Sequence, residues 1–235
     1  ANEQAFYCRP LRLTPDGKQG RMDVPPEASK TKLAFLPPMS GLSTDETRLD
    51  PGAINVRIGE GRTAEVLRNL CLALVTGDDG TRWETLTQTM EQLFGVRLNR
   101  PEYIQERGEV RMSFVNQSGT ELDLSSSGRG LQQTLLLMTY LLSNPGAALL
   151  LDEPDAHLEI LRQRQIYETL SRAAATVGSQ IIAASHSEVI LNEAADRDVV
   201  VAFVGKPHRI DDRGSQVAKA LKWVGFDQYF QAEQT

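Results

Sequence analysis

The sequence predicts an α/β protein in which helices flank a mostly parallel sheet. Residues 147–151 form an uncharged run that is too short for a membrane span and suits a strand buried on both faces of a parallel sheet. From this run onward, strand-like and helix-like segments alternate, which is typical of βαβ units. The 235 residues, 40% of them hydrophobic, suffice for one domain, or for one domain plus a small subdomain.

The expected elements follow from apolar spacing and from turn residues. The expected strands cover residues 5–13, 32–36, 109–115, 120–124, 147–151, 180–184 and 198–204. The expected helices cover residues 62–75, 81–94, 134–142, 156–177, 188–195 and 215–223. Residues 39–60 are turn-rich, and the run NQSG at residues 116–119 predicts a β-hairpin between two strands. The run NPG at residues 144–146 ends the helix before the central strand.

These elements divide the chain into three parts. Residues 1–60 form an N-terminal β-rich segment, residues 61–108 form a helical insert, and residues 109–235 form the core of the domain. The apolar stripes of the insert are interpreted as core packing, because most such stripes are buried. The first half of the chain has no group with catalytic spacing, so the chemistry is expected in the second half.

The composition argues against several classes of protein. The net charge of -6 comes without any basic tract, so it does not support a nucleic-acid groove, although a local patch can sit on an acidic protein. Cys8 and Cys71 are isolated, which fits a reducing cytosol and argues against a disulfide framework or a zinc site. No run approaches the length of a membrane helix, and the polar N-terminus is no signal peptide. We therefore expect a cytoplasmic protein without a membrane partner.

Two carboxylates directly follow the central strand. Asp152 and Glu153 stand where the strand ends, before Pro154, and this edge of a parallel sheet is the usual place for a ligand. Buried acids are costly unless they are paired or bind a metal. We therefore expect Asp152 to hold Mg²⁺ through water, and Glu153 to orient or deprotonate an attacking water. Alternatively the acids, Asp155 above all, cap the helix that follows.

A direct metal cluster is a further alternative at the same place. It would use Asp152, Asp155, His157 and Glu159. If the helix begins near Ala156, the side chains of His157 and Glu159 lie about 200° apart around it and cannot easily share one ion. The water-mediated magnesium site is therefore preferred.

A segment rich in serine and glycine precedes the central strand. In the run LSSSGRGLQQ at residues 124–133, Ser126, Ser127, Gly128 and Gly130 stand where a helix begins. Small residues let a ligand approach the backbone, and the free N–H groups at a helix N-terminus bind anions. The serine hydroxyls add further donors. The alternative is that the serines only cap the helix.

His186 is the third candidate, because it lies just past the strand 180–184 with a serine on each side. A lone histidine is more often structural than functional. This one follows the strand next along the chain from Asp152 and Glu153, so we expect it to point into the same crevice and to contact phosphate. His208 has no such context and is interpreted as a surface residue.

In this order, the motifs resemble the C-terminal part of an ABC-type ATPase head. The run LSSSGRGLQQ is similar to the ABC signature, GAALLLDEP to Walker B with its catalytic glutamate, DAHLE to the D-loop, and IIAASHS to the switch-histidine segment. The resemblance covers residues 120–205, and the spacing from Ser127 to Asp152 is close to that of the family. Within this class, DEPDAHLE and the run KALKWVGFDQYFQAEQT resemble the DNA-associated OLD-family ATPases, which carry a Toprim nuclease domain after the ATPase.

The sequence departs from the family pattern in two places. The P-loop motif GxxxxGK[ST] is absent, because Gly17-Lys18 and Gly205-Lys206 lack both the leading glycine and the following Ser or Thr. In the family this motif lies upstream, so we expect this chain to be part of a longer protein and to be inactive as an ATPase by itself. The doubled glycine of the signature is also split by Arg129.

The resemblance implies a site for ATP and Mg²⁺ between two copies of the head. Asp152 would organise Mg²⁺, Glu153 would polarise the water, and His186 would touch the γ-phosphate. The residues assigned to nucleotide binding, in part that of the partner copy, are Ser126, Ser127, Gly128, Gly130 and Asp155. Among these, Asp155 would couple the two sites.

The leading hypothesis is therefore an ABC-class ATPase that powers a DNA-directed nuclease or a repair or defence machine of the OLD type. Its partners would be a second copy of the head, DNA, and an associated nuclease domain or subunit. The alternative is a non-catalytic ATPase-like module that serves dimerisation or partner binding, but the intact Asp152, Glu153 and His186 count against it. A membrane transporter's ATPase subunit fits less well, because DAHLE and the C-terminal tail look wrong for it.

Overall fold

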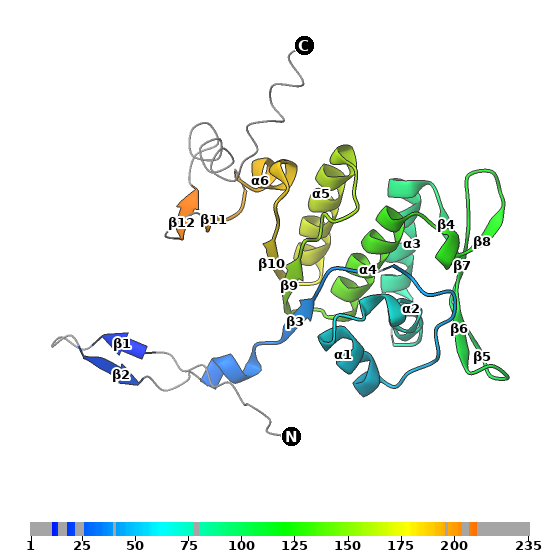
Figure 1. The fold of residues 1–235 in the computed structure, drawn as a ribbon, viewed down its shortest axis with the longest axis horizontal. Coiled ribbons are helices and arrows are strands. Elements are labelled where there is room, and N and C mark those ends of the chain that lie inside the picture. Colours follow the sequence, from blue (N-terminus) through cyan, green and yellow to red (C-terminus); the bar gives the residue numbers. More distant parts are fainter. Residues whose placement is uncertain are drawn as a thin grey trace, which may run out of the picture.

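A small parallel sheet forms the centre of the protein. The computed structural model describes residues 11–13, 18–21, 26–39, 41–77, 80–195, 197–203 and 207–210. Strands β3 (Leu33–Leu36), β9 (Ala148–Asp152) and β10 (Gln180–Ala184) pair in the order β10-β9-β3, and both pairings are parallel (Figure 1). The predicted α/β class, a parallel sheet flanked by helices, is confirmed.

One βαβ unit supplies two of the three strands. Helix α5 (Ile160–Thr176) follows β9 and returns the chain to the start of β10, as a parallel pairing requires. Strand β3 comes from far upstream and joins the other side of β9, which is therefore the middle strand. The carboxyl ends of the three strands meet at one edge of the sheet, beyond Asp152.

Helix α4 (Arg129–Ser143) is the buried centre of the helical layer. Residues 131–142 are all buried, because helices α2 (Leu67–Thr76), α3 (Thr81–Phe94) and α5 pack around it. The helix begins at Arg129 rather than at residue 134. The added turn contains the candidate residue Gly130, which therefore lies inside the first turn of a long helix.

The helices of the insert lie where the apolar stripes of the sequence predicted them. One further helix, which was not predicted, precedes them. Helix α3 has the bounds that the sequence predicted, and Gly95 ends it with a φ of 66°. The expected helix over residues 62–75 is divided into a short 3₁₀ helix, η2 (Thr63–Glu65), and α2. The sequence missed α1 (Pro51–Gly59), which buries two isoleucines four residues apart and has proline in its first turn.

Short antiparallel strands follow helix α3 along the chain. They are β4 (Arg97–Leu98), β5 (Glu102–Ile104), β6 (Glu109–Arg111), β7 (Ser113–Val115) and β8 (Glu121–Asp123). The predicted hairpin is confirmed, since β7 pairs with β8. The predicted strand over residues 109–115 is divided at the buried Met112, because β6 pairs with β5 whereas β7 lies between β4 and β8.

The remaining elements lie at the two ends of the described chain. They are β1 (Leu11–Leu13), β2 (Gln19–Arg21), η1 (Pro26–Lys30), α6 (Glu188–Ala194), β11 (Val200–Ala202) and β12 (His208–Ile210). We expected the strand at residues 198–204 to continue the βαβ series, but β11 pairs antiparallel with β12 instead. The expected helix over residues 215–223 and the first part of the strand over residues 5–13 lie outside the described residues.

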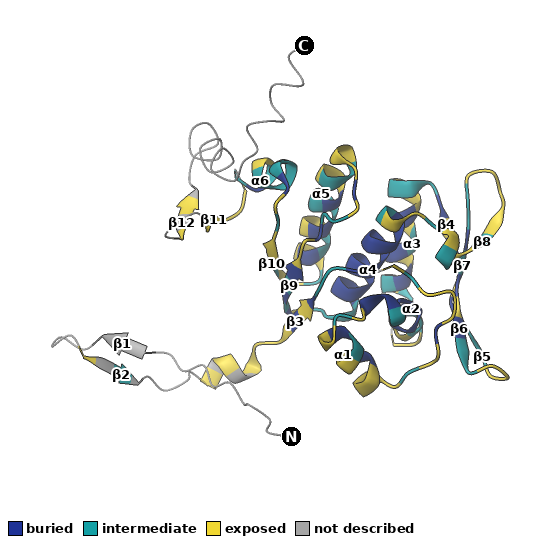
Figure 2. Ribbon diagram, viewed as in Figure 1, coloured by how far each residue is buried: buried dark blue, intermediate teal, exposed yellow. Residues whose placement is uncertain are grey.

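Within the part of the chain that the structure describes, helices cover one face of the parallel sheet. The strand pairing places Phe35, Leu150 and Ile182 side by side on the uncovered face, where Ile182 is 62% exposed. Figure 1 shows α1 to α5 on one side of the sheet, and Figure 2 shows exposed residues along β3 and β10. The expectation that the central strand is buried on both faces is therefore wrong for the described chain, because the described helices cover only the face that carries Leu149 and Leu151.

The segment between β9 and α5 also differs from the prediction. Residues 154–157 form a turn, and α5 begins at Ile160 rather than at residue 156. His157 has a φ of 64°, which no helical residue adopts. Among the described residues, no helix combines the length and the hydrophobicity that a membrane span requires.

Candidate functional site

Two of the predicted residues meet at the carboxyl edge of the sheet. The backbone N–H of Glu153 donates to the carbonyl of Ala184 at 2.9 Å, which holds Glu153 beside the end of β10. His186 lies two residues beyond that end, and its Nε2 atom is 3.8 Å from Glu153 Oε1. The Glu153 side chain is 48% exposed and the His186 side chain 78% exposed, so a ligand can reach both.

Asp152 lies on the same edge, on the uncovered face of the sheet. It pairs in register with Ala184 and shares its face with Leu150, because side chains alternate along a strand. An exposed carboxylate oxygen is the kind of ligand that Mg²⁺ takes, and few protein ligands suffice when water completes the shell. The chemistry of Asp152 therefore fits a magnesium ion.

The described residues do not form the direct metal cluster that was considered as an alternative. Among them, no group of three or more His, Cys, Asp or Glu side chains could hold a metal ion. The estimate that His157 and Glu159 lie about 200° apart assumed that both residues are helical. Both residues precede α5, so this estimate does not describe them. The turn places both residues in the lining of the pocket described below.

Asp155 connects the turn after β9 with the loop after β10. Its Oδ1 atom accepts a 2.6 Å hydrogen bond from Ser185 Oγ. Ser185 Oγ in turn accepts a hydrogen bond from the N–H of Ser187. The Ser187 hydroxyl donates to Gln163 on α5 and accepts from an N–H group in the first turn of α6. The two serines that flank His186 are therefore both bonded, and they define the backbone from which this imidazole projects.

The serine-rich segment forms a compact turn ahead of α4. A 3₁₀ turn, η3 (Leu124–Ser126), leads into it. Ser126 Oγ donates to the carbonyl of Asp123 at 2.5 Å, and Ser127 Oγ donates to the carbonyl of Leu124 at 2.7 Å. These hydroxyls donate to carbonyls and accept from no N–H group of α4, so the alternative that these serines cap the helix does not hold for α4. Gly128 stands at the N-cap position of α4 without a side-chain cap, which leaves N–H groups of the first turn free.

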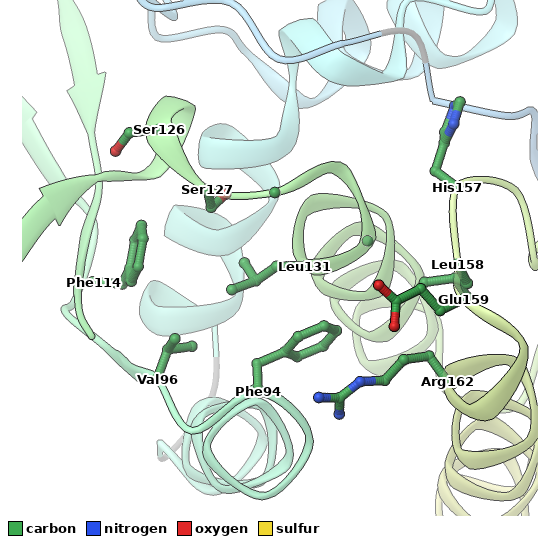
Figure 3. Close-up of a pocket in the computed structure, with 12 residues that line it drawn as sticks. Phe94, Val96, Phe114, Ser126, Ser127, Leu131, His157, Leu158, Glu159 and Arg162 are labelled. Carbon is green, nitrogen blue, oxygen red and sulfur yellow. The ribbon is translucent and has the colours of Figure 1, made fainter. Parts of the chain in front are cut away.

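A pocket of about 440 Å³ opens beside this helix start (Figure 3). It is lined by Phe94, Val96, Phe114, Ser126, Ser127, Gly128, Gly130, Leu131, His157, Leu158, Glu159 and Arg162. A Cβ atom at Gly130 would lie 3.3 Å from Leu158, so glycine permits the close approach of α4 to the turn before α5. The Arg162 guanidinium lies 5.0 Å from the centre of the Phe94 ring and donates to the carbonyl of Leu93.

The predicted residues therefore form two groups. The serines and glycines line the pocket together with residues 157–159, whereas Glu153 and His186 lie together at the carboxyl edge of the sheet. Among the described residues, the pocket lining includes neither the acid pair nor His186. Asp155 lies in the turn between the two groups.

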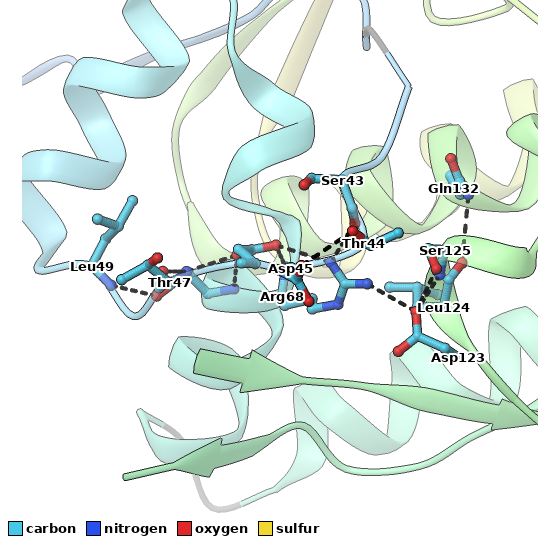
Figure 4. Close-up of polar contacts among 12 residues, drawn as sticks. Ser43, Thr44, Asp45, Thr47, Leu49, Arg68, Asp123, Leu124, Ser125 and Gln132 are labelled. Atoms are coloured by element: carbon cyan, nitrogen blue, oxygen red, sulfur yellow. Dashed lines mark hydrogen bonds and ion pairs between the residues drawn. The ribbon is translucent and has the colours of Figure 1, made fainter. Parts of the chain in front are cut away.

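The sequence did not reveal a buried polar network behind the serine-rich segment (Figure 4). Arg68 on α2, only 1% exposed, donates to the Ser43 carbonyl at 2.9 Å and to Asp123 Oδ1 at 3.1 Å, and its Nη1 atom lies 3.8 Å from Glu46. Glu46 caps α2 from a distance, because its carboxylate accepts from the N–H groups of Arg68 at 2.8 Å and Asn69 at 2.6 Å.

The carboxylates of this network have shifted pKa values. Burial raises the pKa of Glu46 from 4.5 to about 7, although the hydrogen bonds from Asn69 and Arg68 and the charge of Arg68 oppose this shift. Burial also acts to raise the pKa of Asp123, but the hydrogen bonds from Ser125 and the nearby Arg68 outweigh it, so this pKa lies below its usual value.

One feature of the sequence could have revealed the network. Arg68 stands three residues before Cys71 and seven before Val75, so it lies on the apolar face of α2. An arginine on such a face has to be paired, and this observation predicts acidic partners. Its two carboxylates lie 22 and 55 residues away, so no local pattern could identify them.

The fold and site geometry define an α/β domain whose acid pair and histidine lie at the carboxyl edge of a parallel sheet. Residues 42–192, more than half of the chain, match the family described as "AAA domain, putative AbiEii toxin, Type IV TA system". The chain belongs to this family, and it is therefore an AAA-type ATPase domain.

Three known proteins illustrate the range of similarity. The ribosome protection protein VmlR of Bacillus subtilis (strain 168) is 29% identical over 136 residues, which cover 56% of this chain and 23% of that protein. The Smc head domain of Pyrococcus yayanosii is 15% identical with a TM-score of 0.47, covering 74% of this chain and 33% of that one. The SMC head domain of Thermotoga maritima is 19% identical with a TM-score of 0.40, covering 61% and 51%. The chain thus spans a third or less of the first two proteins.

Proposed function

We propose that this chain carries the hydrolytic half of an ATP site that is completed between two ATPase heads. The observation that carries the proposal is the pairing of Glu153 with His186 at the end of two adjacent parallel strands, 3.8 Å apart and open to solvent. The carboxyl edge of such a sheet is where α/β proteins place their ligands. The family match supports ATP as the substrate.

In this proposal each residue at the edge has one role. Glu153 accepts a hydrogen bond from the attacking water and draws off its proton, and His186 donates to the γ-phosphate. Asp152 holds Mg²⁺ through water, and the ion neutralises phosphate charge when it is bound. The positive φ of Glu153, 46°, supports a functional role, because strained backbone is concentrated at active sites.

The serine-rich segment acts on the nucleotide of the partner head. Its position supports this assignment, since Ser127 and Gly128 line a pocket that does not include Glu153 or His186. The free N–H groups of the first turn of α4 and the positive end of its dipole favour phosphate. In the structure the serine hydroxyls donate to backbone carbonyls. In this proposal the main-chain N–H groups therefore bind the phosphate first, and the serine side chains then rotate so that their hydroxyls donate to it as well.

The P-loop is contributed by a segment outside these 235 residues. The uncovered face of the sheet supports this part of the proposal, because parallel sheets are normally covered by helices on both faces. Phe35, Leu150 and Ile182 form an apolar row there, and Asp152 lies at the end of the same face. A strand–helix unit packed on that face would bring its phosphate-binding loop to the carboxyl edge.

We further propose that the ATP-driven association of two heads serves a DNA-directed nuclease or a defence or repair machine of the OLD type. This part rests on the resemblance of the runs DEPDAHLE and KALKWVGFDQYFQAEQT to that family. ATP then acts as the ligand that favours the dimer, and its hydrolysis releases the two heads.

The decisive experiment replaces Glu153 by glutamine in a protein that carries the P-loop as well as this chain. Glutamine keeps the shape of the side chain but cannot take a proton, so turnover should fall about 100-fold or more. ATP should then accumulate at the interface, and the variant should remain dimeric with Mg²⁺ and ATP in light-scattering measurements. Turnover is measured with and without duplex DNA, and stimulation by DNA is expected in the parent protein.

Glu168→Gln is the matched control, because Glu168 is a solvent-exposed carboxylate on α5, outside both groups. It should hydrolyse ATP at the parent rate. Equal rates of ATP hydrolysis by Glu153→Gln and the control would show that Glu153 is not a catalytic residue. A parent protein that neither hydrolyses ATP nor dimerises with it would instead support the non-catalytic ATPase-like module.

A further inference from the structure

Arg68 joins the helical insert to the serine-rich segment across the core. Its guanidinium is fully enclosed and bonds at once to the Ser43 carbonyl and to Asp123 Oδ1, 55 residues away in sequence. The carboxylate of Glu46 lies near the same guanidinium, so two acidic side chains, Glu46 and Asp123, compensate the buried positive charge. Because α2 is itself capped by Glu46, the position of this arginine is set by the helix and not by the segment that it contacts.

Asp123 connects Arg68 to the serine-rich segment. The same Oδ1 atom that binds Arg68 accepts from the N–H of Ser125 at 2.8 Å and from its hydroxyl at 2.7 Å. The carbonyl of Asp123 accepts from Ser126, and the carbonyl of the next residue accepts from Ser127. One carboxylate therefore anchors η3, and Ser127, the residue after this turn, leads to Gly128 at the start of α4.

A second connection ends at the same residues. Gln132 on the first turns of α4, buried, donates to the Ser127 carbonyl at 3.0 Å and lies 3.5 Å from the Leu124 carbonyl. The serine segment is thus held from α4 by Gln132 and from the insert by Arg68 through Asp123. The Asp123 side chain is 47% exposed, which makes this pair the more accessible of the two connections.

We propose that Arg68 and Asp123 form a positioning pair that sets the conformation of residues 124–130, and that the insert controls the partner-facing half of the ATP site through it. The second clause rests on the proposed function; the first does not. Neither residue touches nucleotide in this proposal. A partner that shifts α2 would change the placement of Ser127 and Gly128, and therefore the affinity of one head for the nucleotide of the other.

The test measures amide hydrogen exchange of residues 124–130 in the 235-residue chain. Asp123→Asn keeps an oxygen acceptor for Ser125 but removes the charge that Arg68 binds. Exchange in this segment should become about fivefold faster, as expected for the loss of an ion pair whose carboxylate is half-exposed. Arg68→Lys keeps the charge but loses the fork that reaches Ser43 and Asp123 together, and it should have the same local effect.

The matched control is Glu65→Gln, which removes a similarly exposed carboxylate paired with Arg62, just before α2. Its exchange over residues 124–130 should equal that of the parent. The double variant Arg68→Lys/Asp123→Asn should exchange no faster than either single variant, because both changes break one connection. Unchanged exchange in Asp123→Asn, or additive effects in the double variant, would overturn the positioning pair.

The nucleotide consequence is measured separately, in the Glu153→Gln background of the P-loop-containing protein. Asp123→Asn should raise the ATP concentration for half-maximal dimerisation about fivefold, whereas Glu65→Gln should leave it unchanged. If Asp123→Asn speeds exchange but leaves dimerisation unaffected, the control of the ATP site is refuted. If the Glu153→Gln protein itself fails to dimerise with ATP, the proposed function fails, and the exchange result still decides the positioning pair.

Discussion

At the scale of single residues, the turn between β9 and α5 carries unusual backbone. Among the described residues, Glu153 and His157 are the two non-glycine residues with positive φ, at 46° and 64°. Residues other than glycine pay a steric cost there, and the surrounding structure has to impose the conformation. The hydrogen bond from Glu153 N–H to Ala184 and that from Ser185 to Asp155 supply this constraint.

His157 offers a test of this strain, because it lies outside the pair of proposed catalytic residues. His157→Gly should fold with stability close to that of the parent, since glycine adopts positive φ freely. His157→Val should be less stable than His157→Gly by about 1–3 kcal/mol, because a β-branched residue is the least compatible with this region. Urea unfolding of both variants makes the comparison. Equal stability would mean that His157 does not hold positive φ in solution.

At the scale of elements, helix α2 depends on a residue outside itself. Val66 at its N-cap position offers no side-chain acceptor, and Glu46 takes that role from the loop before α1. Asn69 adds hydrogen bonds to the Thr47 carbonyl and from the Leu49 N–H. The loop before α1, which the sequence shows only as turn-rich, is therefore fixed by the first turn of α2.

The raised pKa of Glu46 predicts a pH dependence of stability. Burial raises this pKa from 4.5 to about 7, so the folded state holds the proton more tightly than the unfolded state does. The contribution of Glu46 is complete below pH 4.5 and is lost as the pH rises to about 7, a fall of about 3 kcal/mol. The difference in unfolding free energy between the parent and Glu46→Gln should shrink by this amount between pH 4.5 and 7.5.

Urea unfolding across this pH range checks the expectation. Glu65→Gln is the control, because it removes an exposed carboxylate and should keep the pH dependence of the parent. A parent protein whose stability difference from Glu46→Gln does not change with pH would show that Glu46 keeps an ordinary pKa.

At the scale of the whole molecule, the uncovered sheet face is the largest departure from expectation. Leu33, Phe35 and Ile182 are exposed on it, whereas the opposite face belongs to the core, and α1 and α5 pack against the strands. Contiguous exposed apolar surface is typical of sites that bind another protein surface. In the proposed function the segment that carries the P-loop covers this face.

Two adjacent isoleucines of β10 test the difference between the faces. Ile181 packs against the core, whereas Ile182 is 62% exposed. Ile181→Thr should lower the unfolding free energy of the chain by about 1.5 kcal/mol, and Ile182→Thr should change it by less than about 0.5 kcal/mol. Ile182→Thr should also reduce the binding of an apolar dye. Equal losses of stability, measured by urea unfolding, would mean that the second face is covered in this chain too.

Much of the fold could be predicted because its signals are local. The apolar run of β9, the helical spacing in α3 and the turn residues before β8 are all contained within a few residues. The order of the motifs along the chain was sufficient to place Glu153 and His186 at the same edge, because parallel strands align their carboxyl ends. Helix α1 was missed since only Ile54 and Ile58 define its buried side.

The tertiary structure alone decided what covers each strand and which distant side chains pair. An uncharged run does not show whether one or two faces are covered, because this depends on where the helices pack. Arg68 likewise needed Glu46 and Asp123, whose distance along the chain leaves no periodic signal. The sequence by itself therefore determined the α/β class and the residues at the carboxyl edge. Only long-range packing determined that the described helices cover one face of the sheet and that Arg68 of α2 bonds to Asp123, just before the serine-rich segment.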